Sequence, residues 1–288
     1  MELNLVLQVL LNGLILSMIY ILVGVGFTLV LGVARVLNFA HTQFYMLGTY
    51  AFWLIHESLG YNFILGMIGG TLSMVLLGGA VYWLFFRHLI GNFFTSMVAS
   101  IGLGLIIVQG VILIFGERDL MITPTFSGVV HVARTAMPAQ KIAILITAMT
   151  LAVAVYFLLK TKVGKAMHAV SINREVAASL GINTNKIYLI VLLVGSGMAG
   201  IAGTVMAPIT MAASHLGNEM IIFALLVVVL GGGGKVKGAV IAGFILGLME
   251  SFGYQLFGKT AVIYIFLIVG VIMYFRPGGL FGIPHELG

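Results

Sequence analysis

The sequence predicts an all-α fold, that of a polytopic membrane protein with about eight to nine transmembrane or re-entrant helices. Hydrophobic residues make up 61% of the 288 positions, and the mean hydropathy is +1.19. Charged residues make up only 8%, whereas a soluble domain carries about 25%. Apolar runs near the length that crosses a bilayer recur along the chain, so we expect residues 1–288 to form a single transmembrane domain.

A basic polar stretch at residues 160–186 fixes the expected orientation. It contains Lys160, Lys162, Lys165, Arg174 and Lys186 against one acid, Glu175. Short basic loops beside membrane spans stay in the cytoplasm, so this stretch becomes a cytoplasmic loop, the N-terminus lies outside and the C-terminus is cytoplasmic. Of the 14 Lys and Arg residues, ten then fall inside, and Arg118, Arg134, Lys141 and Lys259 fall outside.

The chain begins with two apolar runs separated by a short break, and the second run opens with polar residues. Leu5 to Leu31 is long enough to cross the membrane and lacks the basic start and cleavage site of a signal peptide, so we expect a retained span. Asn38 to Ile55 is barely long enough, and it opens with the polar residues Asn38, His41, Thr42 and Gln43. Polar side chains at membrane depth predict a broken helix that lines a cavity.

Three more spans are expected at 63–86, 94–115 and 142–159. The connection between the last two, 116–140, carries charges of both signs together with Pro124 and Pro138. The expected orientation places this connection outside, where it would pack over the mouth of a pathway.

Small residues and glycines mark the second half. The run at 187–213 should lie centrally in the bundle, because small residues let helices approach closely in lipid, and Pro208 should bend its outer end. An outer turn is expected at 214–219. The next apolar run is too short for a span before Gly231, Gly232, Gly233 and Gly234, which predicts a broken or re-entrant segment at 220–236 near the inner surface.

Two further spans at 239–256 and 261–275 complete the chain. Each half then has a long span, an interrupted segment (38–55 and 220–236) and a glycine-rich span. Paired interruptions of this kind indicate the binding site in transporters built from repeats.

Composition and motifs argue against enzymatic work. The stretch GGGGKVK at 231–237 lacks the Gly-Lys-Ser/Thr of a phosphate-binding loop, because Val236 follows Lys235. No HExxH, GxSxG or carboxylate cluster is present, and without cysteine there is no disulfide or thiol chemistry. The net charge of +6 is explained by basic loops beside spans, so nucleic-acid binding is not implied.

A few polar side chains inside the spans are functional candidates, because ionisable groups are costly in lipid. Glu250 lies deepest in a span, and His41 lies near a predicted helix start. Each also has a structural explanation: His41 bonded to a backbone carbonyl, and Glu250 satisfied by Ser251 or a neighbouring helix. Ser96 and Ser100 share one helical face, where they serve either a pathway or helix packing.

The cytoplasmic loop has apolar residues at helical spacing among its charges, and Gly181 with Asn183 marks a helix stop. This pattern predicts one short amphipathic helix. From composition alone, the helix either docks on a protein partner or lies on lipid.

Several segments together resemble the membrane permeases of branched-chain amino acid ATP-binding cassette importers. They are NGLILSMIY at 12–20, NFAH at 38–41 with FYMLG at 44–48, RE at 174–175 running to LGI at 180–182, the glycine cluster with GAV at 238–240, and RPGGLFG at 276–282. The resemblance spans residues 12 to 282. It implies a non-enzymatic transport subunit in a bacterial inner membrane.

The resemblance also implies a role for the loop. Glu175, Ala177 and Gly181 keep the Glu-x-Ala-x3-Gly skeleton of the loop that inserts a coupling helix into an ATPase subunit. The implied coupling residues are Arg174, Glu175, Ala177, Ala178, Leu180 and Gly181. The implied partners are a second permease, two cytoplasmic ATPases that hold ATP and Mg, and a periplasmic solute-binding protein. This chain itself would bind no cofactor and no metal.

One departure from the family pattern bears on the solute. After His41 the family commonly has a small residue and then an acid, whereas this chain has Thr42 and Gln43. Branched-chain or other small hydrophobic amino acids remain the expected solutes, and amides, urea or aromatic acids are the alternatives. The candidate pathway residues are Asn38, His41, Thr42, Gln43, Ser96 and Glu250. A self-sufficient secondary transporter that uses Glu250 and His41 for protons is the alternative from another class.

Overall fold

The computed structural model describes residues 3–132 and 135–281, so Arg134 and Gly282 lie outside the described residues, as do the chain ends. The first half contains α1 (Leu3–Leu29), α2 (Gln43–Trp53), α3 (Phe63–Leu84), α4 (Phe93–Phe115) and α5 (Ala139–Lys160). The second half contains α6 (Lys162–Ile172), α7 (Arg174–Ser179), α8 (Thr184–Thr210), α9 (Leu216–Gly231), α10 (Val236–Phe257) and α11 (Ala261–Phe275). Short turns join them: π turns η1 (Val30–Ala34) and η3 (Leu54–Ser58), and 3-10 turns η2 (Phe39–Thr42), η4 (Phe86–His88) and η5 (Gly258–Thr260).

Six of the described helical segments are long and apolar enough to cross a membrane: Asn4–Ala34, Phe63–Leu89, Phe93–Phe115, Ala139–Lys160, Thr184–Thr210 and Val236–Phe275. The last of these joins α10, η5 and α11. The shorter α2 and α9 have 11 and 16 residues, fewer than the roughly 20 that a perpendicular crossing needs. The chain is therefore a multi-pass helical protein, and the total of eight to nine elements stays a prediction.

Two tight helix pairs hold the bundle together. In the first, α1 packs along α10, and a Cβ atom added at Gly247 would lie 2.2 Å from the backbone nitrogen of Ser17. In the second, α3 packs along α8, where the same addition at Gly78 would meet Oγ of Ser196 at 1.9 Å. Small residues therefore let these backbones approach more closely than any larger side chain allows, as expected for helices in lipid.

The order of helices repeats between the halves. Both α1 and α8 have 27 residues, each is followed by a break and a short helix, and both α3 and α10 then have 22 residues. The pairing is crossed, because α1 of the first half packs on α10 of the second, and α8 of the second packs on α3 of the first. This arrangement agrees with the internal similarity seen in the sequence.

A β-hairpin departs from the all-α prediction. Strands β1 (Val129–Val132) and β2 (Thr135–Pro138) pair antiparallel, with Val129 opposite Pro138, and β2 leads directly into α5. Just before the hairpin, Leu120 pairs with Ala212 through two backbone hydrogen bonds, which ties the 116–140 connection to the end of α8. The connection is thus held on the bundle at both ends.

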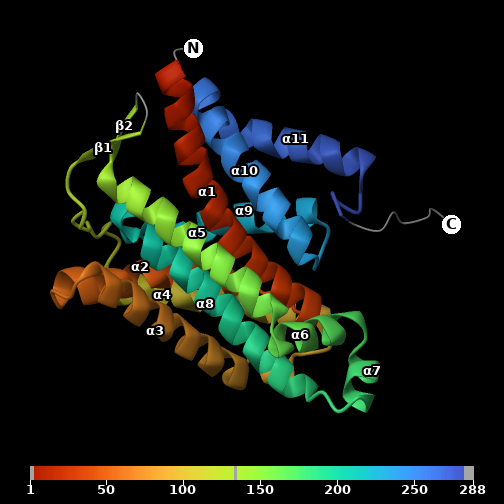
Figure 1. Ribbon diagram of the computed structural model, residues 1–288. Helices are drawn as coiled ribbons and strands as arrows, with labels where there is room; N and C mark the ends of the chain where they lie inside the picture. Colours follow the sequence, from red (N-terminus) through yellow and green to blue (C-terminus); the bar gives the residue numbers. More distant parts are fainter. Residues whose placement is uncertain (1–2, 133–134, 282–288) are drawn as a thin grey trace.

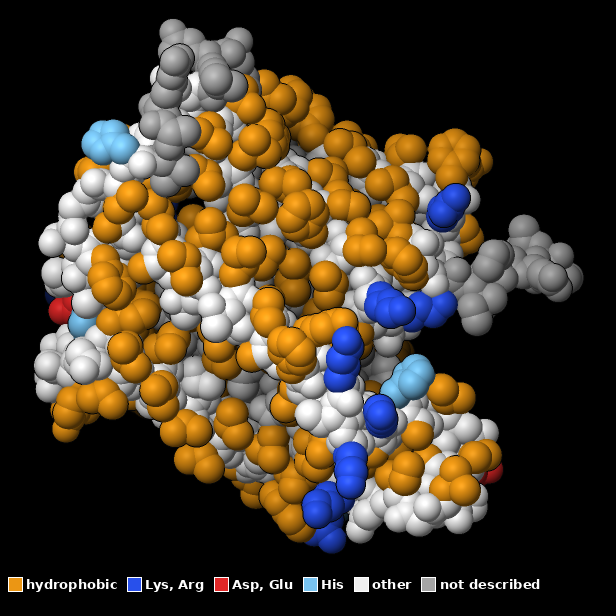
Figure 2. Space-filling view, in the orientation of Figure 1, with side chains coloured by type: hydrophobic (Ala, Val, Ile, Leu, Met, Phe, Trp, Pro, Cys, Tyr) orange, Lys and Arg blue, Asp and Glu red, His pale blue; other side chains and the backbone are white. Residues whose placement is uncertain are grey.

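The hairpin and the α6–α7 segment lie at opposite ends of the bundle, joined by α5 (Figure 1). Figure 2 shows that Lys and Arg side chains gather along the side of the molecule that carries α6 and α7. The predicted orientation requires this segregation of charge. The orientation of the termini themselves stays a prediction.

Candidate functional site at two helix breaks

The first break follows α1. The helix widens into the π turn η1, and Arg35 then adopts a left-handed backbone conformation with φ of 52°, which stops the helix. Asn38 caps the next turn, because its Oδ1 accepts from the backbone nitrogen of Ala40 at 3.0 Å. Asn38 is therefore a structural cap of the break, and it is buried with only 3% of its surface exposed.

Ser100 on α4 holds the same break in place. Its Oγ accepts from the backbone nitrogen of Phe39 at 2.9 Å and lies 3.1 Å from the carbonyl oxygen of Leu37. Ser96, one turn earlier, donates to the carbonyl of Phe93 in its own helix at 2.8 Å. Ser100 thus joins the site and Ser96 does not, although both are fully buried.

His41 faces α1. Its Nε2 lies 3.2 Å from the carbonyl oxygen of Val23, and the edge of its ring packs against Phe27 with 5.4 Å between ring centroids. Gly26 of α1 and Gly195 of α8 lie against the same ring, because a Cβ added at either would lie within 3.5 Å of it. The imidazole therefore joins three elements as a backbone-bonded, buried side chain.

The second break, 211–215, follows α8. It places the start of α9 next to the start of α2. Nε2 of Gln43, at the start of α2, donates to Oδ1 of Asn218 in the first turn of α9 at 3.0 Å. Gly217 provides the room, because a Cβ there would lie 2.1 Å from Oε1 of Gln43. The outer turn expected at 214–219 is wrong in part, since α9 already begins at Leu216.

Two buried polar atoms at this crossing lack a hydrogen-bond partner in the described part of the chain. They are Oγ1 of Thr42 and Oε1 of Gln43, on residues with 0% and 4% of their surface exposed. Buried polar atoms are nearly always paired in proteins, and an unpaired one costs about 1–3 kcal/mol. The crossing of α2 and α9 therefore contains one hydroxyl and one amide oxygen whose hydrogen-bonding capacity no described residue uses.

Glu250 of α10 has a hydrogen-bond partner of its own, on α1. The hydroxyl of Tyr20 donates to its Oε2, and the Tyr20 ring stacks on Phe223 with centroids 4.7 Å apart. Ser251 instead donates to the carbonyl of Val9 at 2.7 Å. Of the two partners expected for Glu250, the neighbouring helix is the one observed, and no hydrogen bond links its carboxylate to the α2–α9 crossing.

The glycine cluster forms the turn between α9 and α10. Gly232, Gly233 and Gly234 have φ values of 93°, 37° and 85°, a region that larger residues rarely adopt. Gly231 and Gly238 touch, because a Cβ on Gly238 would lie 1.8 Å from the Gly231 carbonyl oxygen. The cluster therefore ends the helix, as predicted, and also lets α9 and α10 fold closely together.

The coupling segment contains two helices where one was expected. Asn173 separates α6 from α7, and its Oδ1 caps α7 by accepting from the backbone nitrogens of Glu175 and Val176 at 2.9 and 3.1 Å. Gly181, with φ of 83°, ends the segment at the predicted position. The break arises because the Asn173 side chain replaces a helical hydrogen bond, which is typical of this residue type.

The α7 helix projects from the bundle. Ala177 is buried, and the Arg174 guanidinium lies 5.5 Å from the centre of the Tyr188 ring on α8. The exposed face carries Glu175 and Ala178 together with the apolar residues Ile172, Val176 and Leu180, which expose 68%, 53% and 75% of their surface. Val176 and Leu180 lie four residues apart and form one short exposed apolar stripe along α7, whereas Ile172 is the last residue of α6, before the Asn173 break.

Sequence reasoning missed Asn218, Gly217 and Tyr20 as parts of these contacts. Asn218 was assigned to a turn, although a polar residue beside Gly217 ahead of an apolar run marks a helix start. Tyr20 lies 230 positions from Glu250, and nothing local indicates that pair. Within the described residues, no group of three His, Cys, Asp or Glu side chains is placed to hold a metal ion.

The chain matches the family model for the permease component of branched-chain amino acid transport systems over residues 9–276. The chain belongs to this permease family. It is 26% identical to the LivH permease of Salmonella typhimurium and 28% identical to the BraD permease of Pseudomonas aeruginosa, in both cases over 97% of this chain and 96% of the relative. It is also 25% identical to Escherichia coli LivM, over 92% of this chain and 68% of that protein. No solved structure matches the chain.

Family membership fits the geometry of this permease. The match covers both helix breaks, the glycine turn and the coupling segment, so all the structural features described above lie inside the matched region. The likeness to both LivH and LivM shows that this kind of chain exists in two related forms in one organism, Escherichia coli. This permease is therefore a multi-pass transport subunit and not an enzyme.

Proposed function

We propose that this chain is a permease subunit of an ATP-binding cassette importer in a bacterial inner membrane. It passes branched-chain or other small, mainly hydrophobic amino acids that a periplasmic binding protein delivers. A second permease, of the same family, completes the pathway, and two cytoplasmic ATPases supply the driving force. The relatives named LivH and BraD, whose printed names give high-affinity branched-chain amino acid transport, support this solute class.

The observation that carries the proposal is the projecting α7 helix. The stripe formed by Val176 and Leu180 is exposed at the basic end of the bundle, with Ile172 exposed at the end of α6, while Ala177 and Tyr188 anchor the helix to α6 and α8. An apolar helix face flanked by charges fits a groove on a soluble partner. A helix held at one face by the bundle and at the other by an ATPase transmits movement between them, provided that the ATPase binds the two permease states differently.

The crossing of α2 and α9 is the proposed point where the pathway narrows. α9 begins there, and the first turn of a helix carries partial positive charge that suits a carboxylate, while the acid of that turn, Glu219, is exposed. The unpartnered oxygens of Thr42 and Gln43 would accept from the ammonium group of the same amino acid. Gln43 is neutral, so the crossing suits a zwitterion with no net charge.

The secondary-transporter alternative has less support from the structure. His41 is bonded to the carbonyl of Val23, and Glu250 is bonded to Tyr20, so each has a structural partner. A proton relay needs a chain of groups between the two sides of the membrane. No hydrogen bond connects His41 to Glu250 in the described residues.

Co-purification tests the proposal. The tagged chain is isolated from its native membrane as wild type and as the double variant Glu175→Arg plus Gly181→Asp, with Lys259→Asp as a charge-reversal control on the exposed η5 turn. We expect ATPase subunits to accompany the wild type and the control, and to be lost from the double variant. Purification of the wild type without any ATPase, combined with transport by the chain alone in liposomes, would contradict the proposal.

A further inference from the structure

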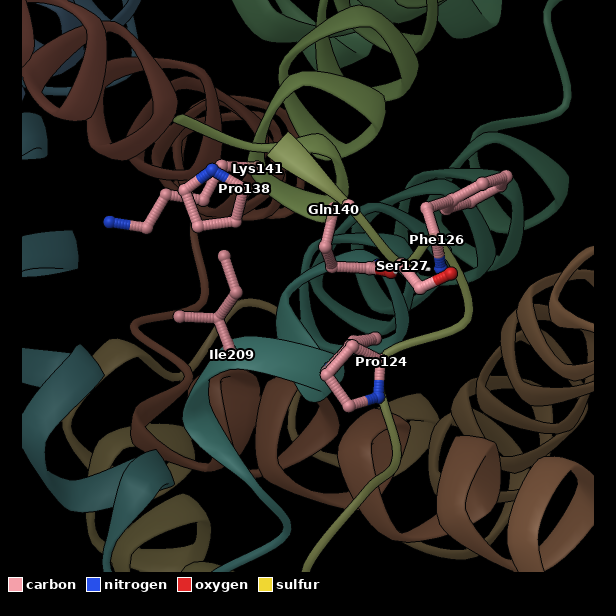
Figure 3. A pocket seen from close by; sticks show the side chains of 9 residues that line it. Pro124, Phe126, Ser127, Pro138, Gln140, Lys141 and Ile209 are labelled. Atoms are coloured by element: carbon pink, nitrogen blue, oxygen red, sulfur yellow. Dashed lines mark hydrogen bonds between the residues drawn. The ribbon is translucent and has the colours of Figure 1, made fainter. Parts of the chain in front are cut away.

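A cavity of about 410 Å³ lies at the end of the bundle that carries the hairpin, between the start of α5 and the end of α8 (Figure 3). It is lined by Pro124, Phe126, Ser127, Gly128, Pro138, Gln140, Lys141, Pro208 and Ile209. This volume falls within the range of roughly 300–1,000 Å³ typical of small-molecule sites. The cavity lies away from the α2–α9 crossing, because none of its lining residues belongs to either helix.

Gln140 brings a buried, unused donor to this cavity. Its Oε1 accepts from the backbone nitrogen of Phe126 at 3.0 Å, which fixes the orientation of the amide, since only the oxygen can accept. Its Nε2 is buried and has no partner among the described residues, and the side chain exposes only 3% of its surface. A buried amide nitrogen without an acceptor points to a ligand that supplies one.

Positive charge lies at one edge of the cavity. In Figure 3 the Lys141 side chain extends away from Gln140 toward α1, where its Nζ donates to Oδ1 of Asn12 at 2.9 Å. Gln140 and Lys141 lie in the first turn of α5, and the N-cap residue of that helix, Pro138, makes no side-chain cap hydrogen bond. The N-terminus of this 22-residue helix, where the backbone nitrogen of Ala139 donates to the carbonyl oxygen of Gly128 at 3.0 Å, adds partial positive charge in the same place. None of the lining residues is acidic.

The remaining wall is apolar. Pro124, Phe126, Pro138, Pro208 and Ile209 make up most of the lining. A site with a few convergent polar groups and an apolar wall selects a small molecule with one charged end and a hydrophobic body. The polar groups here are donors, so the charged end is an anion.

We propose that this cavity is an outer binding site for the carboxylate of a small hydrophobic amino acid, which Nε2 of Gln140 binds and the charge of Lys141 attracts, with the side chain of the amino acid against Phe126 and Ile209. The identification of the ligand as an amino acid rests on the proposed function. The site would hold the solute before it reaches the α2–α9 crossing, and Pro208 and Ile209 at the end of α8 join the two places through one helix.

Ligand-observed NMR on the full chain in nanodiscs of zwitterionic lipid tests the site. The probes are L-leucine, 4-methylpentanoate and isoamylamine. 4-Methylpentanoate has the carboxylate of leucine without the amine, and isoamylamine has the amine without the carboxylate. We expect L-leucine and 4-methylpentanoate to bind and isoamylamine not to bind. Gln140→Glu keeps the acceptor for Phe126 and replaces the donor with a repelling oxygen, so it should weaken both carboxylates about tenfold or more, the size expected for a hydrogen bond to a charged group.

Lys141→Gln is the second variant, because it keeps a donor for Asn12 and removes the charge, and it should weaken the same two probes. Lys259→Gln removes a cation from the exposed η5 turn and should change nothing. Equal binding of isoamylamine, unchanged affinity in both cavity variants, or no binding of either carboxylate to the wild type would overturn the assignment. Each of these results leaves ATPase co-purification untouched, so the failure of this site is distinguishable from the failure of the proposed function.

Discussion

Nε2 of Gln43 donates to Oδ1 of Asn218 at 3.0 Å, which joins the first turn of α2 to the first turn of α9 across 175 positions of sequence. The two helices hold corresponding places in the two halves of the chain. α2 continues through η3 toward one end of the bundle, and α9 runs to the glycine turn near η1, where Gly234 touches Gly32. One side-chain contact therefore connects the two interrupted helices of the repeat.

The Gln43–Asn218 contact predicts coupled effects on transport. Gln43→Leu and Asn218→Leu should each lower solute uptake, and the double variant should be no worse than the more severe single variant, because both remove the same hydrogen bond. Each single variant also leaves a buried amide unpaired, at a cost of about 1–3 kcal/mol. Uptake and thermal unfolding of all three variants measure this. Gln109→Leu on the exposed face of α4 is the matched control, and simple additivity of the two effects would count against the contact.

Close packing of α2 on α8 predicts that Gly203 cannot be enlarged. A Cβ there would lie 2.0 Å from the backbone oxygen of Tyr45, an atom that cannot rotate away. Gly203→Ala should therefore lower the unfolding temperature by several degrees, at a cost of roughly 1–3 kcal/mol for overpacking. Gly102→Ala in α4 meets nothing within 4 Å and should be neutral or stabilising, because alanine has the higher helix propensity. Thermal unfolding in detergent compares the two, and equal melting temperatures would contradict the packing.

The Tyr20–Glu250 contact predicts a structural role for the acid. Glu250→Gln keeps an oxygen that can accept from the Tyr20 hydroxyl, so uptake by the assembled transporter and its dependence on pH should be retained. Glu250→Leu leaves that hydroxyl without its partner beside Phe223 and should lower stability. Uptake measured across a pH series distinguishes the roles. Loss of uptake in Glu250→Gln with an intact fold would revive the proton-linked alternative.

The cap of α7 predicts a defect in coupling with no defect in the bundle. Asn173→Ala removes the acceptor for the backbone nitrogens of Glu175 and Val176, at a cost of about 0.5–2 kcal/mol to this short helix. We expect weaker ATPase binding, an unchanged unfolding temperature of the bundle, and rescue by Asn173→Asp, which restores a capping oxygen. ATPase affinity measured on the purified variants checks this, and full affinity in Asn173→Ala would show that the α7 cap is dispensable.

The sequence predicted the long helices well, because each is an apolar run closed by a charge or a glycine. Arg35 ends the first helical region, as a charge after an apolar run indicates, although its left-handed conformation and the cap at Asn38 were not predicted. The helix stop at Gly181 was predicted because glycine readily adopts the left-handed conformation found there. These are local effects, and local composition is enough to find them.

Contacts between distant segments could not be predicted. Asn218 meets Gln43, and Tyr20 meets Glu250, only because the crossed packing of the two halves places them together. The hairpin at 129–138 was missed because the surrounding connection is rich in proline and mixed charge, which indicates a loop. Ser96 and Ser100 are equivalent by their spacing on the helix. Their roles differ because the backbone nitrogen of Phe39 reaches Ser100, whereas Ser96 bonds within its own helix.

The most direct test of the account is a cross-link from α7 to the ATPase. The chain has no cysteine, so Val176→Cys introduces a single thiol in the exposed apolar stripe, and Lys259→Cys places one on the exposed η5 turn as the control. In native membranes, with cysteines introduced along the ATPase groove, the account predicts a cross-linked permease–ATPase band for Val176→Cys that changes in yield when ATP is added, and none for Lys259→Cys. Absence of that band in a transporter that still imports solute would contradict docking through α7.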